Sequence, residues 1–200
     1  MKKYVAFLCF LMLFPLYCFA AVISPVAQMQ REANQMIVQL EANKARLGNI
    51  NVIRKIVNNI LLPHVNLDRM SASVVGQPWR TATPAQRAQF EKEFSFLVTT
   101  TYAAALSSYD GDKVMFHPLR ESFASRQTMR INSVIVRKTG QRIPVTYDVE
   151  RVGDAWKVYD FSIENVSMVQ SYRSQFASTL ASGGMPALLS RLASHNRSTK

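Results

Sequence analysis

The chain has 200 residues, of which 48% are hydrophobic and 18% are charged, so it holds enough apolar material for one substantial core. Lysines and arginines number 24 against 13 aspartates and glutamates, giving a formal net charge of +11. No repeat, long charge block or low-complexity stretch occurs, which excludes collagen-like, coiled-coil and disordered classes and predicts a single domain.

Residues 1–20 have the form of a secretory signal peptide. Lys2 and Lys3 precede an apolar run, and small residues lead up to Ala20, after which we predict cleavage. A proline interrupts the run, which is too short for a membrane anchor. The mature chain, 21–200, would carry no cysteine and a net charge of +9, since two of the 24 basic residues leave with the signal. We therefore expect an exported domain without disulfides.

The first predicted helix of the mature chain begins at Ser24, which can cap it, with Pro25 in its first turn. Apolar residues then recur every three or four positions along one face, namely Val26, Met29, Ala33, Met36 and Leu40. Polar residues are expected largely on the opposite face, namely Arg31, Glu32, Gln35 and Gln39.

Three more helices are predicted before any strand. The second follows Gly48 and is stopped or kinked by Pro63, and a short third helix covers 66–75. Thr83 and Gln86 form a capping box, so a long helix should start there. Its broad apolar face is wide enough to touch two layers and carries Phe90, Phe94, Leu97, Val98, Thr101, Tyr102 and Ala105.

Beyond Tyr109 the hydrophobic period changes to two, which predicts strands. Short turns at Thr139-Gly140 and Gly153-Asp154 join neighbouring strands, so the pairing should be antiparallel. The result is a meander of about four strands, near 114–119, 127–138, 143–150 and 156–163.

Helices return after the sheet. Ser167 to Gln170 reads as a second capping box, and the helix it opens should end at Gly183 and Gly184. Pro186 then opens a short terminal helix, and 195–200 are expected to fray. The predicted fold class is α+β, with a single antiparallel sheet of about four strands packed against six or seven helices.

The sequence offers few residues that are suited to catalysis or metal binding. The only histidines are His64, His117 and His195, without metal-ligand spacing, and the sequence has no nucleophile elbow or phosphate-binding glycine loop. The Asp110-Gly111-Asp112 stretch favours a turn over a calcium site, and the sequence favours a capping or packed role for His64 over a catalytic base. Basic residues are scattered, which disfavours nucleic acid. A solvated surface, or one that meets anionic membranes or acidic protein partners, stays open as an alternative.

Four stretches of the mature chain, taken together, carry a family resemblance. They are Leu61-Leu62-Pro63-His64-Val65; Trp79-Arg80 with Ala82 to Arg87 and Phe90; Thr101-Tyr102-Ala103; and Trp156 to Asp160 leading to Val166 to Val169 and Tyr172 to Phe176. In this order, over roughly 24–192, the sequence resembles the MlaC, or toluene-tolerance, family of periplasmic phospholipid-binding proteins. Two residues differ from the pattern common in this family. Asn66 stands where members commonly have Asp, and Asn165 stands where they commonly have Gly, which adopts the left-handed conformation of a turn more freely than Asn.

The resemblance implies a periplasmic carrier that shuttles diacyl phospholipid between the outer and inner membranes and so maintains outer-membrane lipid asymmetry. It implies two partners: an outer-membrane lipoprotein and porin complex, and an inner-membrane ABC transporter with an MCE-domain protein. It also implies no cofactor, no catalytic residue and no enzymatic activity.

The lipid pocket is expected between the apolar sheet face and the helices, with acyl tails buried. Periodicity and motif position together select its candidate lining residues, Leu97, Val98, Tyr102, Val145, Tyr147, Val149, Val158, Val166, Val169, Tyr172 and Phe176. Two alternatives stay open. A periplasmic protein-binding adaptor would have a filled core, and a small-molecule enzyme would need a pocket-facing group such as Asp148, Asp160 or His117.

Overall fold

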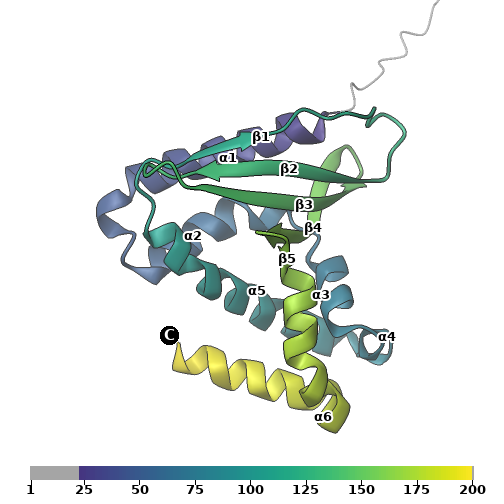
Figure 1. The fold of residues 1–200 in the computed structure, drawn as a ribbon. Helices are drawn as coiled ribbons and strands as arrows, with labels where there is room; N and C mark the ends of the chain where they lie inside the picture. Colours follow the sequence, from purple (N-terminus) through teal and green to yellow (C-terminus); the bar gives the residue numbers. More distant parts are fainter. Residues whose placement is uncertain (1–22, 200) are drawn as a thin grey trace, which may run out of the picture.

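A computed structural model describes residues 23–199, so the predicted signal peptide lies outside the described residues. Within that range the chain forms an α+β fold with one antiparallel sheet (Figure 1). The helices are α1 (Pro25–Ala42), α2 (Ile50–Ile60), α3 (Leu67–Val75), α4 (Pro78–Thr81), α5 (Pro84–Ser107) and α6 (Met168–Ser198), with 3₁₀ turns η1 (Lys44–Arg46) and η2 (Leu62–His64). The strands are β1 (Lys113–Phe116), β2 (Thr128–Val136), β3 (Arg142–Val152), β4 (Ala155–Ile163) and β5 (Val166–Ser167).

The predicted helix starts are confirmed at α1 and α5. The Ser24 hydroxyl caps α1 by accepting from the backbone N–H of Ala27. At α5 the capping box is complete, because Gln86 N–H donates to Thr83 Oγ1 over 3.2 Å and Thr83 N–H donates to Gln86 Oε1 over 2.9 Å. Both caps satisfy backbone donors that have no partner within the first helical turn.

The sheet follows chain order, β1-β2-β3-β4-β5, with every neighbouring pair antiparallel. The four predicted strands are present, and the fifth, β5, has only two residues. In the turn before β5, Glu164 and Asn165 have φ values of 51° and 67°. Asn165 therefore takes the left-handed conformation itself, which asparagine tolerates better than most residues.

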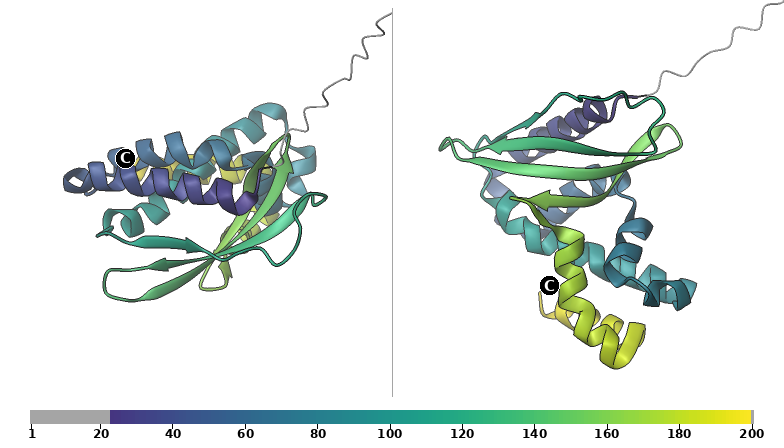
Figure 2. Two further views of the ribbon diagram at one scale, coloured as in Figure 1. Left: turned by 90° about the horizontal axis from the view of Figure 1, so that it is seen from above. Right: turned by 45° about the vertical axis from the view of Figure 1, so that its right-hand side comes forward.

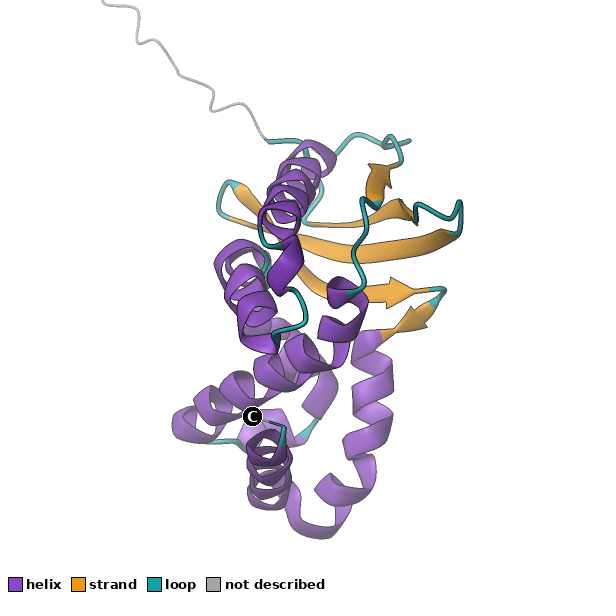
Figure 3. Ribbon diagram, turned by 90° about the vertical axis from the view of Figure 1, so that its left-hand side faces the viewer, coloured by secondary structure: helices purple, strands orange, loops and turns teal. Residues whose placement is uncertain are grey.

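The helices gather on one face of the sheet (Figures 2 and 3). Helix α1 packs there, where Met29 joins Ile131, Val149 and Trp156 in a buried cluster. Helices α3, α4, α5 and α6 form a second layer that extends beyond the sheet, with its own aromatic core. In that core Phe94 contacts Phe90, Tyr172 and Phe176, with ring centroids 5.2 to 6.2 Å apart.

The C-terminal segment corrects one prediction. Helix α6 bends at Gly184, where φ is 59°, as the glycine pair and Pro186 indicated. The tail expected to fray from residue 195 is instead helical as far as Ser198. Asn196 is 2% exposed, and its Nδ2 donates to the carbonyl oxygen of Glu93 in α5 over 2.9 Å. That long-range hydrogen bond fastens the tail to the helical layer.

None of the helices within residues 23–199 combines the length and the apolar character that a membrane span requires.

Candidate functional site

A cavity of about 320 Å³ lies between the helix-covered face of the sheet and helices α1, α2 and α5. The connector from α2 to α3, which includes η2, closes one side of it. Aliphatic and aromatic side chains make up nearly all of the lining. The polar exceptions are Glu32, His64, Ser95, Thr99 and the hydroxyls of Tyr102 and Tyr147. Such a lining suits an apolar ligand that is held by burial.

Strand alternation builds the sheet wall of the cavity. On β3, Val145 and Tyr147 point to the same face, two residues apart, and their partners across β4 are Ile163 and Phe161. Register then shifts between Asp148 and Val149, which leaves an extra residue on β4. A bulge of this kind bends a strand and increases its twist, so the sheet wall is bent and twisted at this point.

Helix α5 builds the opposite wall, and most of its apolar contribution comes from one row of side chains. Phe94, Val98, Tyr102 and Ala105 follow one another at spacings of four, four and three, so they lie above one another on one side of the helix. Ala105 lines the cavity and is also exposed, which places it at the mouth. The other sides of α5 face α6 and α2.

Five of the eleven predicted lining residues face the cavity, namely Val98, Tyr102, Val145, Tyr147 and Val158. Six lie elsewhere. Val149 is fully buried in the cluster beneath α1, and Val166 is 64% exposed on β5. The remaining four lie in the core between α5 and α6, namely Leu97, Val169, Tyr172 and Phe176. Periodicity predicted which faces of the helices and strands are apolar. It did not predict whether a neighbouring helix already packs against such a face.

The sequence predictions also missed one whole side of the cavity. Helices α1 and α2 and the connector contribute Met29, Glu32, Ala33, Val57, Leu61, Leu62, His64 and Val65. A signal was available, because the apolar run around Pro63 is one of the motifs behind the family resemblance. Its placement over the cavity depends on long-range contacts that sequence periodicity does not encode, among them a parallel bridge between Val65 and Val158.

A hydrogen-bonded cluster of Gln28, Glu32 and His64 holds the α1 side of the cavity together. The burial of Glu32 in this cluster corrects a second prediction. Glu32, expected on the solvent face, is 8% exposed. Its Oε1 accepts from Gln28 Nε2 over 2.8 Å and lies 2.9 Å from Nδ1 of His64. The Gln28 side chain in turn donates to the backbone carbonyl oxygen of Trp156 over 2.7 Å and accepts from the backbone N–H of Trp156 over 2.9 Å. The group thus links α1 to both β4 and the connector.

Burial has the largest effect on the pKa values of the side chains around the cavity. It raises the pKa of Glu32 above its ordinary value, against the hydrogen bond from Gln28 and the charges of His64 and Arg31, which lower it. Burial likewise raises the pKa of Tyr102 and of Tyr147, so both phenols stay neutral. The side chain of His64 is 35% exposed, which places it at the rim of the cavity.

The three groups named above for an enzyme alternative lie away from the cavity, whereas the carboxylate and the histidine that do line it, Glu32 and His64, are paired with each other. Asp148 forms a two-pronged ion pair with Arg130, at 2.8 and 3.1 Å. Asp160 accepts from the N–H of Val169 and from the Ser167 hydroxyl at the start of α6. His117 is exposed beyond β1. Within residues 23–199 no group of three or more histidine, cysteine or acidic side chains is placed to hold a metal ion.

Comparison with known proteins places this fold and cavity in a family. Residues 30–194 match the family described as MlaC protein. The chain belongs to the MlaC family. Its fold also resembles the phospholipid-binding protein of Ralstonia solanacearum, solved in complex with a phospholipid, with a TM-score of 0.82 and 25% identity. That match covers 88% of this chain and 98% of the other.

Two curated relatives in the MlaC family carry functional names. The intermembrane phospholipid transport system binding protein MlaC of Haemophilus influenzae is 29% identical over 173 residues, which cover 84% of this chain and 80% of the relative. Toluene tolerance protein Ttg2D of Pseudomonas putida is 28% identical over 173 residues, covering 86% of this chain and 79% of the relative. Both names describe binding or tolerance, and neither names a catalysed reaction.

Proposed function

We propose that this protein is a periplasmic phospholipid carrier, without enzymatic activity, that holds the acyl chains of its cargo in the cavity between α5 and the sheet. The observation that carries the proposal is the almost wholly hydrocarbon lining of that cavity. Membership of the MlaC family and the phospholipid complex of the Ralstonia protein support it. The cargo is a diacyl phospholipid with its head group at the mouth.

The energetics explain why such a cargo needs a carrier. About thirty acyl methylenes exposed to water cost about 0.8 kcal/mol each, or roughly 24 kcal/mol. A dry hydrocarbon-lined site replaces the bilayer interior, so transfer into the protein is close to neutral. The direction of transport must then be set by the membrane partners. We infer these to be an outer-membrane lipoprotein and porin complex, and an inner-membrane ABC transporter with an MCE-domain protein.

The volume of the cavity indicates how the protein should change when a phospholipid binds. At about 320 Å³ it lies at the lower end of the ~300–1,000 Å³ usual for ligand sites. We expect two acyl chains to widen it by moving the sheet away from α5. The proposed acyl contacts are Val98, Tyr102, Val145, Tyr147 and Val158, together with Met29, Val57 and Leu61 on the side that the sequence analysis missed.

Mass spectrometry of an organic extract tests the proposal, using mature protein secreted to the periplasm and purified without detergent. We expect nearly one diacyl phospholipid per protein molecule. Folded protein without lipid would contradict the proposal and favour a protein-binding adaptor or a small-molecule enzyme.

A matched pair of variants locates the cargo. Ala105 and Ala104 are both exposed neighbours on α5, but only Ala105 lines the cavity. Ala105→Trp should obstruct the mouth and lower the lipid recovered several-fold, whereas Ala104→Trp should leave it unchanged. Equal lipid recovery from the two folded variants would show that the cargo lies elsewhere.

A further inference from the structure

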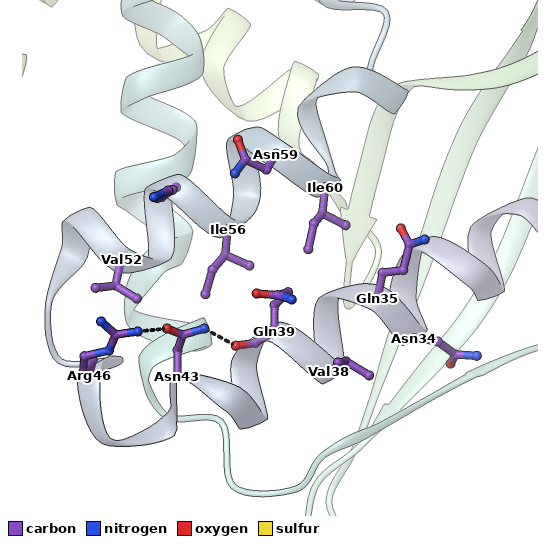
Figure 4. A pocket seen from close by; sticks show the side chains of 11 residues that line it. Asn34, Gln35, Val38, Gln39, Asn43, Arg46, Val52, Ile56, Asn59 and Ile60 are labelled. Carbon is purple, nitrogen blue, oxygen red and sulfur yellow. Dashed lines mark hydrogen bonds between the residues drawn. The ribbon is translucent and has the colours of Figure 1, made fainter.

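A second hollow, of about 670 Å³, runs between α1 and α2 (Figure 4). Val38 lies in it with 61% of its surface exposed. Half-buried and buried aliphatic residues of α2 supply its apolar surface, namely Val52, Ile56 and Ile60. We call this hollow the α1–α2 groove.

Amide side chains and two cations supply the polar part of the α1–α2 groove. The amides are Asn34, Gln35, Gln39, Asn43 and Asn59, and the cations are Arg46 and Lys55. Within residues 23–199, no carboxylate lines the groove. In the part of the chain that the structure describes, neither cation lies within salt-bridge distance of a carboxylate. Arg46 is positioned by a hydrogen bond to the Asn43 side chain, drawn in Figure 4.

We propose that the α1–α2 groove is a docking site for an acidic polypeptide segment of a partner protein. Carboxylates of the segment would meet Arg46 and Lys55, and an apolar side chain would cover Val38. The amides offer both donors and acceptors to the backbone and polar groups of the segment.

Shape and charge favour this occupant over two others. A hollow complements a protruding segment, whereas a membrane surface is flat and is met by a protruding cationic face. A second copy of the mature chain, with a net charge of +9, offers poor charge complementarity to a groove whose lining within residues 23–199 holds cations and no carboxylates.

The position of the α1–α2 groove connects docking to the cargo. Helix α1 lines the lipid cavity with Met29 and Ala33, and α2 lines it with Val57. The same two helices therefore form the groove on one side and a cavity wall on another. The inference rests on the proposed function, because a lipid carrier has to dock before it exchanges its cargo.

The experiment uses a photo-reactive benzoylphenylalanine at position 38 of the full chain, expressed in its native host and irradiated in living cells. Cross-linked peptides are sequenced by mass spectrometry, then synthesised and titrated by fluorescence anisotropy. The charge-reversal variant is Arg46→Glu with Lys55→Glu. The matched control is Lys113→Glu with Arg142→Glu, which makes the same charge change at exposed residues of the sheet, also without salt bridges.

We expect a cross-link to an acidic segment of another envelope protein, lost in the Arg46 and Lys55 variant and retained in the control. The synthetic peptide should bind the charge-reversal variant about ten-fold more weakly than wild type, and its affinity should fall with added salt. A self cross-link, a lipid adduct, a neutral or basic captured peptide, no adduct at all, or equal affinity for both double variants would overturn the inference.

The lipid content of the same preparations separates the two proposals. Wild-type protein with phospholipid but without the expected cross-link overturns only the docking site. Wild-type protein that contains no phospholipid overturns the proposed function, while the cross-link and the anisotropy data still report on docking.

Discussion

Glu32 shows how one residue departs from the pattern around it. The apolar face predicted for α1 is correct at Met29, Met36 and Leu40, which are buried. Glu32 and Gln28 are buried beside them because their partners, His64 and the backbone of Trp156, come from distant segments. A prediction from helical periodicity uses only residue type and spacing. It therefore places a carboxylate on the solvent face, because it contains no information about a partner in a distant segment.

The raised pKa of Glu32 predicts a pH dependence of stability. Burial favours the neutral carboxyl in the folded state, whereas the unfolded chain loses this proton near pH 4.3. Above that pH the folded state binds more protons, so this contribution to stability is lost as pH rises through the folded pKa. Glu32→Gln stays neutral and keeps an acceptor for Gln28, and it should therefore flatten the decline in the free energy of unfolding.

Urea unfolding at a series of pH values from about 4 to 7 measures this effect. Glu164→Gln is the control, because Glu164 is exposed in the turn before β5. The control should follow the wild-type slope. If Glu32→Gln also followed it, burial of the carboxyl would not be the source of the pH dependence.

At the scale of elements, the sequence predicted most helices and strands because their signals are local. The caps at Ser24 and Thr83 and the alternation along β3 depend on residues within a few positions of one another. The two-residue strand β5 pairs locally with β4, through Ile163 and Val166, but is too short to give an alternating pattern. The docked C-terminal tail depends on contacts that lie far away in sequence. Asn196, for example, bonds to Glu93 across 103 positions, so the composition of the tail alone suggested fraying.

The start of α6 illustrates the same limit and yields a prediction. The second capping box forms only in part: Ser167 Oγ accepts from Gln170 N–H over 3.0 Å, but the N–H of Val169 donates to Asp160 on β4 over 3.0 Å. Asp160→Ala removes this capping carboxylate and should lower the free energy of unfolding by about 1–2 kcal/mol. Asp160→Asn keeps an acceptor oxygen and should lose less.

Thermal unfolding followed by circular dichroism compares these variants. A loss of 1–2 kcal/mol corresponds to a decrease in Tm of roughly 2–8 °C for a chain of this size. Asp154→Ala, in the exposed turn between β3 and β4, is the control and should leave Tm nearly unchanged. Equal Tm values for Asp160→Ala and Asp154→Ala would contradict an anchoring role for Asp160.

At the scale of the whole molecule, the site was harder to predict than the fold. Leu97 and Val98 are adjacent apolar residues of α5, yet Leu97 packs into the core with α6 and Val98 faces the cavity. Local sequence gives both residues the same character. Whether an apolar face is filled or left open depends on how the layers meet, and in this fold α5 meets α6 on one side and the curved sheet on the other.

Because the cavity lies between the sheet and the helical layer, its cargo should stabilise the whole fold. A ligand that binds only folded protein adds about 2.7 kcal/mol at a hundred times its Kd, which raises Tm by roughly 5–11 °C for a chain of this size. Removal of lipid should lower Tm by that amount. In Ala105→Trp, whose mouth is obstructed, delipidation should change Tm little, whereas Ala104→Trp should respond as wild type does. Equal Tm values for loaded and delipidated wild-type protein would mean that the lipid does not join the two layers, because a cargo that bridges them cannot leave without weakening their contact.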